Sequence, residues 1–238
     1  MDASEPRKIA GYPALLSDVD VELPPVPGQP AAGALASDSV RLFTVDRFEE
    51  LVDRGALLRP EDVPEPPYWA LVWIGARAIA GEMIAEPPAA DARVLDLGCG
   101  LGLSGLAAAR AGAHVTFVDY VPDCLDFVRA SAEAAALKNY DALVVDFTRD
   151  RPPARYDLVL AADVVYDPES YVALADFLDA ALAGDGTILL TESLRADAKD
   201  FLALLAARGF ERTTDARWIS EEGRRERTWL HRLCRSRS

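Results

Sequence analysis

The sequence predicts an α/β fold: a doubly wound, mostly parallel seven-stranded sheet with helices on both faces and an antiparallel strand pair at its C-terminal end. Three observations lead to this prediction. Short apolar runs alternate with segments of helical periodicity between residues 69 and 208. The last two apolar segments are joined by a charged turn that contains glycine, as in a hairpin. Four of the runs end at, or lie just before, an aspartate: Asp96, Asp119, Asp146 and Asp163.

Each expected strand is a short run of β-branched or large apolar residues. The strands cover, in order, Val94–Leu97, Val115–Val118, Ala142–Val145, Leu158–Ala161, Thr187–Thr191, Phe210–Trp218 and Arg227–Leu233. In a parallel sheet the carboxyl ends of the strands meet at one edge, which is where ligands bind. The four aspartates therefore predict a pocket at that edge.

The helices expected between these strands differ in character. The first carries its apolar residues on one face and is followed by Pro87 and Pro88, which cannot continue it. The second is made of small residues that allow close packing on a sheet. The third has proline at its first position and Asp123 in its first turn, both favourable there. The expected helices are Trp69–Ile84, Leu103–Ala111, Pro122–Ala136, Ser170–Leu182 and Ala196–Arg208.

Residues 1–66 lack the alternation of strands and helices that is expected for the rest of the chain. Residues 1–38 are rich in Pro, Ala, Ser and Asp and are expected to form an extended or partly disordered arm. Residues 39–66 are expected to be an extension with a strand at Val40–Val45 and a short helix capped by Asp46. Four prolines between residues 60 and 67 mark the expected start of the main domain at residues 67–238.

Composition narrows the class of protein. Half of the 238 residues are hydrophobic, yet no apolar run is long enough to cross a membrane and no signal-peptide core follows the N-terminus. Three cysteines form neither a disulfide framework nor a C-x-x-C pair, so we expect no metal site and a cytoplasmic setting. A net charge of −14 disfavours a nucleic-acid substrate. It suits a basic protein surface or a neutral small molecule, although solubility alone could explain it.

The most specific motif is Asp96-x-Gly98-x-Gly100-x-Gly102, a strand that turns through a tight loop into a helix. Its glycines permit unusual dihedrals and close approach of a ligand. The overlapping residues 100–105 also satisfy the dinucleotide pattern G-x-G-x-x-G, and Asp119 could hold a ribose in either interpretation. A carboxylate at Asp96 repels a pyrophosphate but attracts a cation. The motif therefore favours S-adenosylmethionine (SAM) over a dinucleotide or a purely structural turn.

Over residues 66–233 the chain resembles the class I, seven-β-strand SAM-dependent methyltransferases. The glycine loop, Asp119 and the terminal strand pair carry this resemblance. Two segments resemble one subgroup more closely: Pro66–Trp73, with its two tryptophans, and Asp157–Tyr166, which contains the signature Asp163-x-x-Tyr166. This subgroup contains protein lysine methyltransferases that act on electron-transfer flavoprotein and on molecular chaperones.

The resemblance implies roles at the methionine and ribose end of the cofactor. Asp96 would orient the methionine amino group. The backbone of Gly98, Cys99 and Gly100 would run along the methionine and the ribose. Asp119 would accept hydrogen bonds from the two ribose hydroxyls.

It also implies roles at the adenine and sulfonium ends. Tyr120 would flank the adenine, Asp146 would bind its exocyclic amine, and Phe147 would stack beside it. Trp73 would close the pocket, and Ala162 would present its carbonyl near the sulfonium. Trp73 and Phe147 could instead be ordinary core residues, as aromatic residues on apolar faces commonly are.

Asp163 and Tyr166 are the candidate catalytic pair. A lysine amine must lose its proton before it can attack a methyl group. Apolar surroundings that include Tyr166 would favour the neutral amine, whereas the carboxylate of Asp163 would favour the charged form. Asp163 is therefore interpreted as an acceptor that orients the amine rather than as a strong base, in a reaction accelerated mainly by positioning.

The favoured function is SAM-dependent methylation of a lysine in a protein substrate with a basic or lysine-bearing surface. A small-molecule N- or O-methyltransferase is the nearest alternative, and a non-catalytic SAM-binding partner protein is the second. A dinucleotide oxidoreductase ranks last because no group of His, Tyr or Lys residues suited to hydride transfer follows Gly105.

Overall fold

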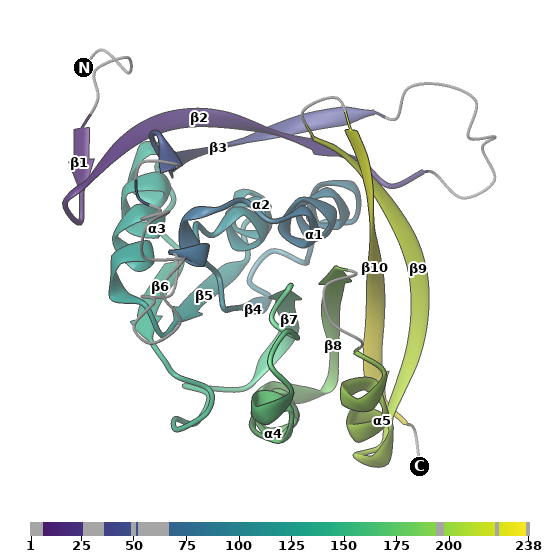
Figure 1. Ribbon diagram of the computed structural model, residues 1–238. Coiled ribbons are helices and arrows are strands. Elements are labelled where there is room, and N and C mark those ends of the chain that lie inside the picture. The colour runs from purple at the N-terminus through teal and green to yellow at the C-terminus, as the bar shows by residue number, and fades with distance from the viewer. Residues whose placement is uncertain are drawn as a thin grey trace, which may run out of the picture.

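The computed structural model describes residues 7–25, 36–48, 51, 67–193, 198–221 and 224–236. Two sheets organise this part of the chain, a seven-stranded sheet and a three-stranded sheet (Figure 1). The larger sheet has the order β6-β5-β4-β7-β8-β10-β9. Its strands are β4 (Arg93–Leu97), β5 (His114–Asp119), β6 (Tyr140–Val144), β7 (Tyr156–Ala162), β8 (Leu182–Ser193), β9 (Phe210–Glu221) and β10 (Arg224–Arg235).

The register of the large sheet confirms the predicted fold class. Strands β6, β5, β4, β7 and β8 run parallel, and β10 lies antiparallel to both β8 and β9. The order of the strands reverses at β4, which has β5 on one side and β7 on the other. Ligands bind at such a switch point in open α/β sheets.

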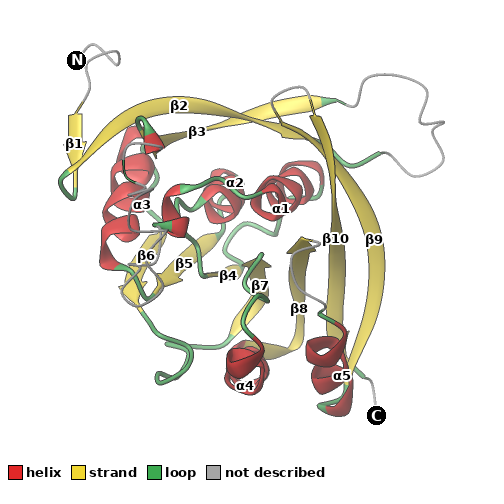
Figure 2. Cartoon of the chain, in the orientation of Figure 1, coloured by secondary structure: helices red, strands yellow, loops and turns green. Residues whose placement is uncertain are grey.

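Helices cover both faces of this sheet, as Figure 2 shows. One face packs against α1 (Ile74–Ala85), α2 (Leu103–Arg110) and α3 (Pro122–Ala134). The other packs against α4 (Tyr171–Ala181) and α5 (Lys199–Ala207). Each face has its own cluster of buried apolar side chains, which include Phe127 on the first face and Phe177 on the second. None of the described helices is both long and apolar enough to cross a membrane.

The first helix begins later than the sequence predicts. Residues Tyr68–Ala70 form a 3-10 turn, Trp73 is extended (φ −74°, ψ 150°), and α1 starts only at Ile74. The helical spacing of the apolar residues continues through this segment, but tertiary contacts override it. The ring of Trp69 packs against Tyr12 and Phe127, with ring centroids 5.3 and 5.5 Å away.

The N-terminal segment also differs from expectation. Residues of the expected arm form β1 (Arg7–Ile9) and β2 (Tyr12–Glu22), which pair antiparallel with each other, and β2 pairs with β3 (Ser37–Val45). The strand predicted at Val40–Val45 is thus confirmed within β3. Buried Val19 and Val21 on β2 explain the difference, because alternation of apolar side chains outweighs the proline-rich composition around them.

This small sheet covers helices of the main domain. The backbone N–H of Phe43 donates to Ser131 Oγ on α3 at 2.9 Å, and Arg77 on α1 donates to the Asp20 carbonyl at 2.6 Å. Strands on both sides of the expected boundary at residue 38 therefore share one sheet. The short helix expected after Asp46 falls almost wholly outside the described residues.

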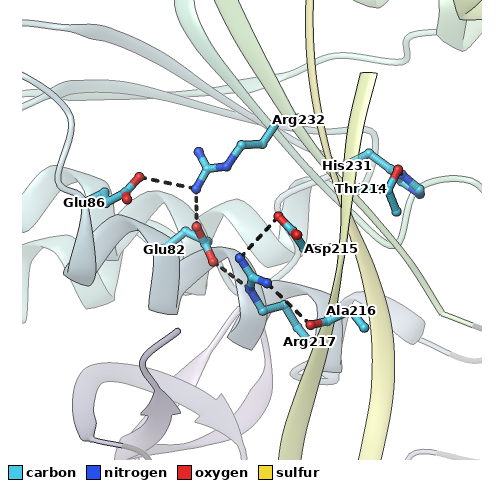
Figure 3. A network of polar contacts seen from close by, with 8 residues as sticks. All are labelled: Glu82, Glu86, Thr214, Asp215, Ala216, Arg217, His231 and Arg232. Carbon is cyan, nitrogen blue, oxygen red and sulfur yellow. Dashed lines mark hydrogen bonds and ion pairs between the residues drawn. The ribbon is translucent and has the colours of Figure 1, made fainter. Parts of the chain in front are cut away.

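A buried carboxylate fastens the C-terminal hairpin to α1 (Figure 3). Glu82 is almost fully buried, accepts from Arg217 Nε at 2.8 Å, and pairs with Arg232. Arg232 also reaches Glu86. A buried charge without its partners is strongly destabilising, so this network fixes the hairpin relative to α1.

Candidate active site

A pocket of about 330 Å³ opens at the carboxyl ends of β4, β5 and β7. Its walls come from the segment before α1, the glycine loop, the ends of β5 and β7, and the loop after β6. All but one of the predicted site residues line it: Trp73, Asp96, Gly98, Cys99, Gly100, Asp119, Tyr120, Phe147, Ala162, Asp163 and Tyr166. The pocket size is typical of small-molecule and cofactor sites.

The glycine loop has the backbone that its sequence predicts. Gly98, Gly100 and Gly102 have φ values of +62°, +50° and +79°, a region that residues with side chains rarely adopt. A Cβ on Gly98 would also lie 2.7 Å from Val164 Cγ1, and one on Gly100 would lie 3.0 Å from the Trp69 carbonyl oxygen. The glycines thus serve both conformation and close packing around the pocket.

Asp96 lies on β4, and its buried carboxylate contacts the start of helix α2. Its side chain is 1% exposed, and Oδ2 accepts the N–H of Gly105 in the first turn of α2 at 2.9 Å. Burial raises the pKa of Asp96 to about 7, and the nearby charge of Asp119 adds to this, while the Gly105 hydrogen bond opposes it. No cationic side chain among the described residues pairs with Asp96, so a bound cation would stabilise its negative form.

Asp119 ends β5 and holds the loops on either side of it. Its Oδ2 accepts from the Gly100 N–H and its Oδ1 from the Val121 N–H, both at 3.0 Å. Burial raises the pKa of Asp119, and its hydrogen bonds with Val121 and Gly100 act against this. Each carboxylate oxygen can accept more than one hydrogen bond. The side chain is therefore preorganised and can still accept from a ligand.

Asp163 follows β7, and its side chain contacts the start of helix α1. Its Oδ2 accepts the N–H of Gly75 in the first turn of α1 at 2.9 Å. Its own N–H faces Thr191 Oγ1 and carbonyl oxygen, each at 3.3 Å. With φ +54°, Asp163 has a conformation that non-glycine residues adopt uncommonly and often at functional sites.

The close contact of Asp163 with α1 requires glycine at position 75. A Cβ there would overlap both Thr191 Oγ1 and Asp163 Oδ2. The pocket wall therefore contains two carboxylates, Asp96 and Asp163, each held by the N-terminal turn of a different helix. In their ionised forms both would attract a cationic ligand bound in the pocket.

Aromatic side chains form the rest of the wall. Trp73 donates from Nε1 to the Tyr68 carbonyl at 3.0 Å, and the two rings lie 6.1 Å apart. Phe147 contacts Phe177 edge-on at 6.4 Å. Tyr166 is 57% exposed, so it lies at the open side of the pocket. Trp73 and Phe147 both line the pocket.

Asp146 is the one predicted site residue outside the pocket lining. Its Oδ1 accepts from the Thr148 N–H at 2.9 Å and from the Thr148 hydroxyl at 2.5 Å, and Arg149 lies 3.5 Å from Oδ2. The hydroxyl hydrogen bond, above all, lowers the pKa of Asp146. The side chain stabilises its own turn, and its role at the adenine stays a prediction.

Other residues of the site were not predicted from the sequence. Tyr68, Leu71 and Ser104 line the pocket, and Gly75 and Thr191 support Asp163. The signal that could have indicated Gly75 is a glycine within an otherwise apolar helical pattern, which commonly has a packing reason.

Two thiols lie beside Asp119. The ligand atoms of Cys99, Asp119 and Cys124 all lie within 4.8 Å of one another. The Cys124 thiol donates to the Val121 carbonyl at 3.0 Å, and burial raises the pKa of Cys99 well above its ordinary value. Since a metal ligand must be a thiolate, this cluster is better suited to neutral thiols that pack under the loop.

Comparison with known proteins identifies the family. Residues 70–208 match the lysine methyltransferase family. The chain is 34% identical over 148 residues to an electron transfer flavoprotein beta subunit lysine methyltransferase of Danio rerio, a match that covers 59% of this chain and 56% of that protein. It is 34% identical over 136 residues to the protein N-lysine methyltransferase METTL21A of Danio rerio, covering 53% of this chain and 61% of that protein. The chain thus spans between half and two thirds of the length of these relatives.

Solved structures agree on the fold. A TehB-like SAM-dependent methyltransferase of Corynebacterium glutamicum matches with a TM-score of 0.55 at 20% identity, over 69% of this chain and 89% of that one. A Burkholderia thailandensis 1,6-didemethyltoxoflavin-N1-methyltransferase, solved with S-adenosylhomocysteine, matches with a TM-score of 0.54 at 18% identity, over 69% and 79%. With the family match over more than half of its length, this chain belongs to the lysine methyltransferase family of SAM-dependent enzymes.

Proposed function

We propose that this chain transfers a methyl group from SAM to the side-chain amine of a lysine in a protein. The observation that carries the proposal is the placement of Asp163. Its carboxylate is held by the first turn of α1 in the wall of an acidic pocket, and the exposed ring of Tyr166 lies three residues further on at the mouth. This arrangement offers an acceptor for an amine that enters from outside.

The chemistry of the pocket fits SAM. When bound, SAM supplies an electrophilic methyl group on a positively charged sulfonium. Asp96 would hold its ammonium group, because that carboxylate is buried and no described side chain supplies a cation to it. Asp119 would accept from the ribose hydroxyls with lone pairs that Gly100 and Val121 leave open. Tyr120 and Phe147 would contact the adenine, and Trp73 would cover the cofactor.

The acceptor amine would be oriented by Asp163 and shielded by Tyr166. An amine must be neutral to attack, and an apolar environment lowers the pKa of a lysine. The carboxylate of Asp163 acts in the opposite direction on that pKa, so its contribution is geometric. Alignment of the attacking nitrogen acts mainly on the transition state and therefore on turnover.

A relative of another kind supports a second candidate. The chain is 30% identical over 164 residues to a ubiquinone biosynthesis O-methyltransferase of Xanthomonas campestris pv. campestris, covering 68% of this chain and 66% of that protein. A small aromatic acceptor could also enter beside Tyr166. The open mouth favours the protein substrate, since a small acceptor is better served by a closed chamber.

The decisive experiment offers both classes of acceptor. Cell lysate and a set of small phenols are incubated with methyl-labelled SAM and the enzyme, and the labelled products are hydrolysed and identified. Labelled methyllysine in protein supports the proposal, and a labelled small molecule without labelled protein overturns it.

The variant Asp163→Asn tests the role of this carboxylate. The amide keeps one acceptor of nearly the same shape, so SAM affinity measured by calorimetry should be largely retained. Turnover should fall by about a hundredfold, the cost of a misplaced reacting group. Equal losses of affinity and turnover would place Asp163 at the cofactor instead of the acceptor.

A further inference from the structure

The tip of the C-terminal hairpin extends past the sheet at the edge where the pocket opens. Strand β8 runs parallel to β7 and ends at Ser193, which pairs with Thr228 of β10. Residues 224–227 continue beyond this pair, and within the described part of the chain they pair with β9 alone. Figure 1 shows the two strands rising together above the end of β8. The tip therefore stands on the pocket side of the sheet.

Packing ties this tip to the pocket wall. Ile219 of β9 is buried in a cluster with Ile74 and Ala78 from the first turns of α1. The same end of α1 receives the carboxylate of Asp163 at Gly75. The hairpin tip is therefore joined to the end of α1 that borders the pocket, through the face of the hairpin that carries Ile219.

Four side chains on the tip or directly next to it share one face, which we term the hairpin patch: Trp218, Arg225, Arg227 and Trp229. The register places Trp218 opposite Arg227, and Ser220 opposite Arg225. The guanidinium of Arg227 lies 4.8 Å from the centroid of the Trp229 ring and 5.9 Å from that of Trp218. Arg225 lies 5.9 Å from the Trp218 ring, which is 47% exposed.

Two arginines on the other face of the hairpin are neutralised by one carboxylate. There Arg217 and Arg232 both bind the carboxylate of Glu82, as Figure 3 shows. In contrast, no described side chain forms an ion pair with Arg225 or Arg227, and Arg227 Nε is buried without a hydrogen-bond partner among the described residues. On a chain of net charge −14, Arg225 and Arg227 thus have no ion pair with a described side chain, while the carboxylate of Glu22 accepts from the Ser220 N–H at 3.2 Å and lines the same hollow as Arg225.

The chemistry of the patch indicates its ligand. An arginine stacked on an indole can still present its terminal NH2 groups, since Arg227 Nε is buried, and these groups match a carboxylate in a two-pronged geometry. We propose that the hairpin patch docks an acidic segment of the protein substrate, near the lysine that enters the pocket. The substrate class is then a protein whose target lysine has carboxylates close by, and the specificity of the enzyme lies partly on this hairpin. This inference rests on the proposed function.

The test uses two lysine peptides and the full chain. One peptide has a central lysine with a run of glutamates on one side, and the other has glutamines in their place. Binding of the fluorescent peptides is followed by polarisation at low and high salt, with no SAM present. The acidic peptide should bind more tightly than the neutral one, and salt should weaken its binding because screening acts on exposed charges.

Variants assign the binding to the patch. Arg225→Glu/Arg227→Glu should lower the affinity for the acidic peptide by about tenfold or more, since attraction becomes repulsion at two positions. The charge-matched control is Arg151→Glu/Arg212→Glu, because both arginines are exposed and lie outside the patch. Trp218→Ala should weaken binding without any change of net charge. Circular dichroism confirms that each variant is folded.

The outcomes separate this inference from the proposed function. Equal binding of the two peptides, or equal effects of the two charge reversals, overturns the docking site. A patch-dependent preference for a single-stranded oligonucleotide, or a dimer that only the patch variant dissociates, also overturns it. Because binding is measured without SAM, it can succeed when methylation fails. In that case the docking site stands and the proposed reaction does not.

Discussion

The charge of Asp96 should control how tightly the enzyme binds SAM. Burial raises the pKa of this carboxyl from 3.8 to about 7, which corresponds to about 4 kcal/mol by which the pocket disfavours the charged form. A ligand with an ammonium group favours that charged form. Binding therefore has to remove the proton from Asp96, and this proton release makes the affinity depend on pH.

The size of this effect follows from the pKa. At pH 6, about one unit below the pKa of Asp96, about nine tenths of the free protein carries the proton, whereas at pH 8 only about one tenth does. If SAM binds only the ionised form, its affinity should rise by about tenfold between these two pH values. Asp96→Asn keeps an acceptor for the Gly105 N–H but has no proton to release.

Calorimetry over this pH range, on the wild type and on Asp96→Asn, measures the contribution directly. In the ratio of the wild-type affinity to the variant affinity, the pH effects of SAM itself and of the titratable groups common to both proteins cancel. We expect this ratio to change by about tenfold. A ratio that stays constant from pH 6 to pH 8 would refute the reasoning, because Asp96 would then not change its charge when SAM binds.

The raised pKa of Asp96 also predicts how the stability of the ligand-free protein depends on pH. The folded pKa of Asp96 lies above the unfolded value, so the native state holds the proton more tightly. The stability gained from this proton is complete below about pH 4 and is lost as the pH rises through 7. Thermal unfolding without ligand should therefore show a larger decrease in Tm from pH 6 to pH 8 in the wild type than in Asp96→Asn. An equal decrease in both proteins would contradict this.

Three further predictions test other parts of the site. Asp119→Ala removes a charged acceptor and should weaken SAM binding by at least about tenfold, given about 1.5–3 kcal/mol for each such hydrogen bond; unchanged affinity in a folded variant would remove Asp119 from the cofactor site. Gly75→Ala should lower both Tm and turnover, because its Cβ would displace Asp163, and wild-type turnover would show that this contact is unimportant. Alkylation near pH 8, followed by mass spectrometry, should modify Cys234 well before Cys99, because Cys234 is exposed and burial raises the pKa of Cys99. Faster reaction at Cys99 would contradict its assignment as a neutral packed thiol.

Local patterns in the sequence determined the main fold and the side of the pocket formed by the glycine loop and the strand ends. Alternating apolar runs and helical segments specify a doubly wound sheet, since each element must bury its apolar face against a neighbour. The positive φ values of Gly98, Gly100 and Gly102 could be predicted without knowledge of the rest of the chain, because they follow from the local geometry of the loop. Aspartates at the ends of parallel strands meet at one edge for the same geometric reason.

Only the tertiary structure decided where helix α1 begins and how Asp163 is held. The helical spacing of Trp69 and Trp73 predicts an earlier start, but contacts with Tyr12 and Phe127 from distant segments hold Trp69 in a turn. The hydrogen bond between Asp163 and Gly75 joins residues 88 positions apart. A spacing rule describes one element at a time and contains no information on such pairs.

In the C-terminal hairpin, too, some features follow from the sequence and others from the tertiary structure. Its two strands could be predicted from the sequence, whereas the sequence does not distinguish its arginines from one another; residues 222–223 of the predicted turn lie outside the described residues. The fold pairs Arg217 and Arg232 with a buried glutamate on α1 and stacks Arg225 and Arg227 on indole rings at the opposite face. The side of the sheet to which a side chain points depends on strand register, and register is set by long-range packing. For this reason the sequence determined the class of chemistry, and the tertiary structure decided which charges are available to a partner.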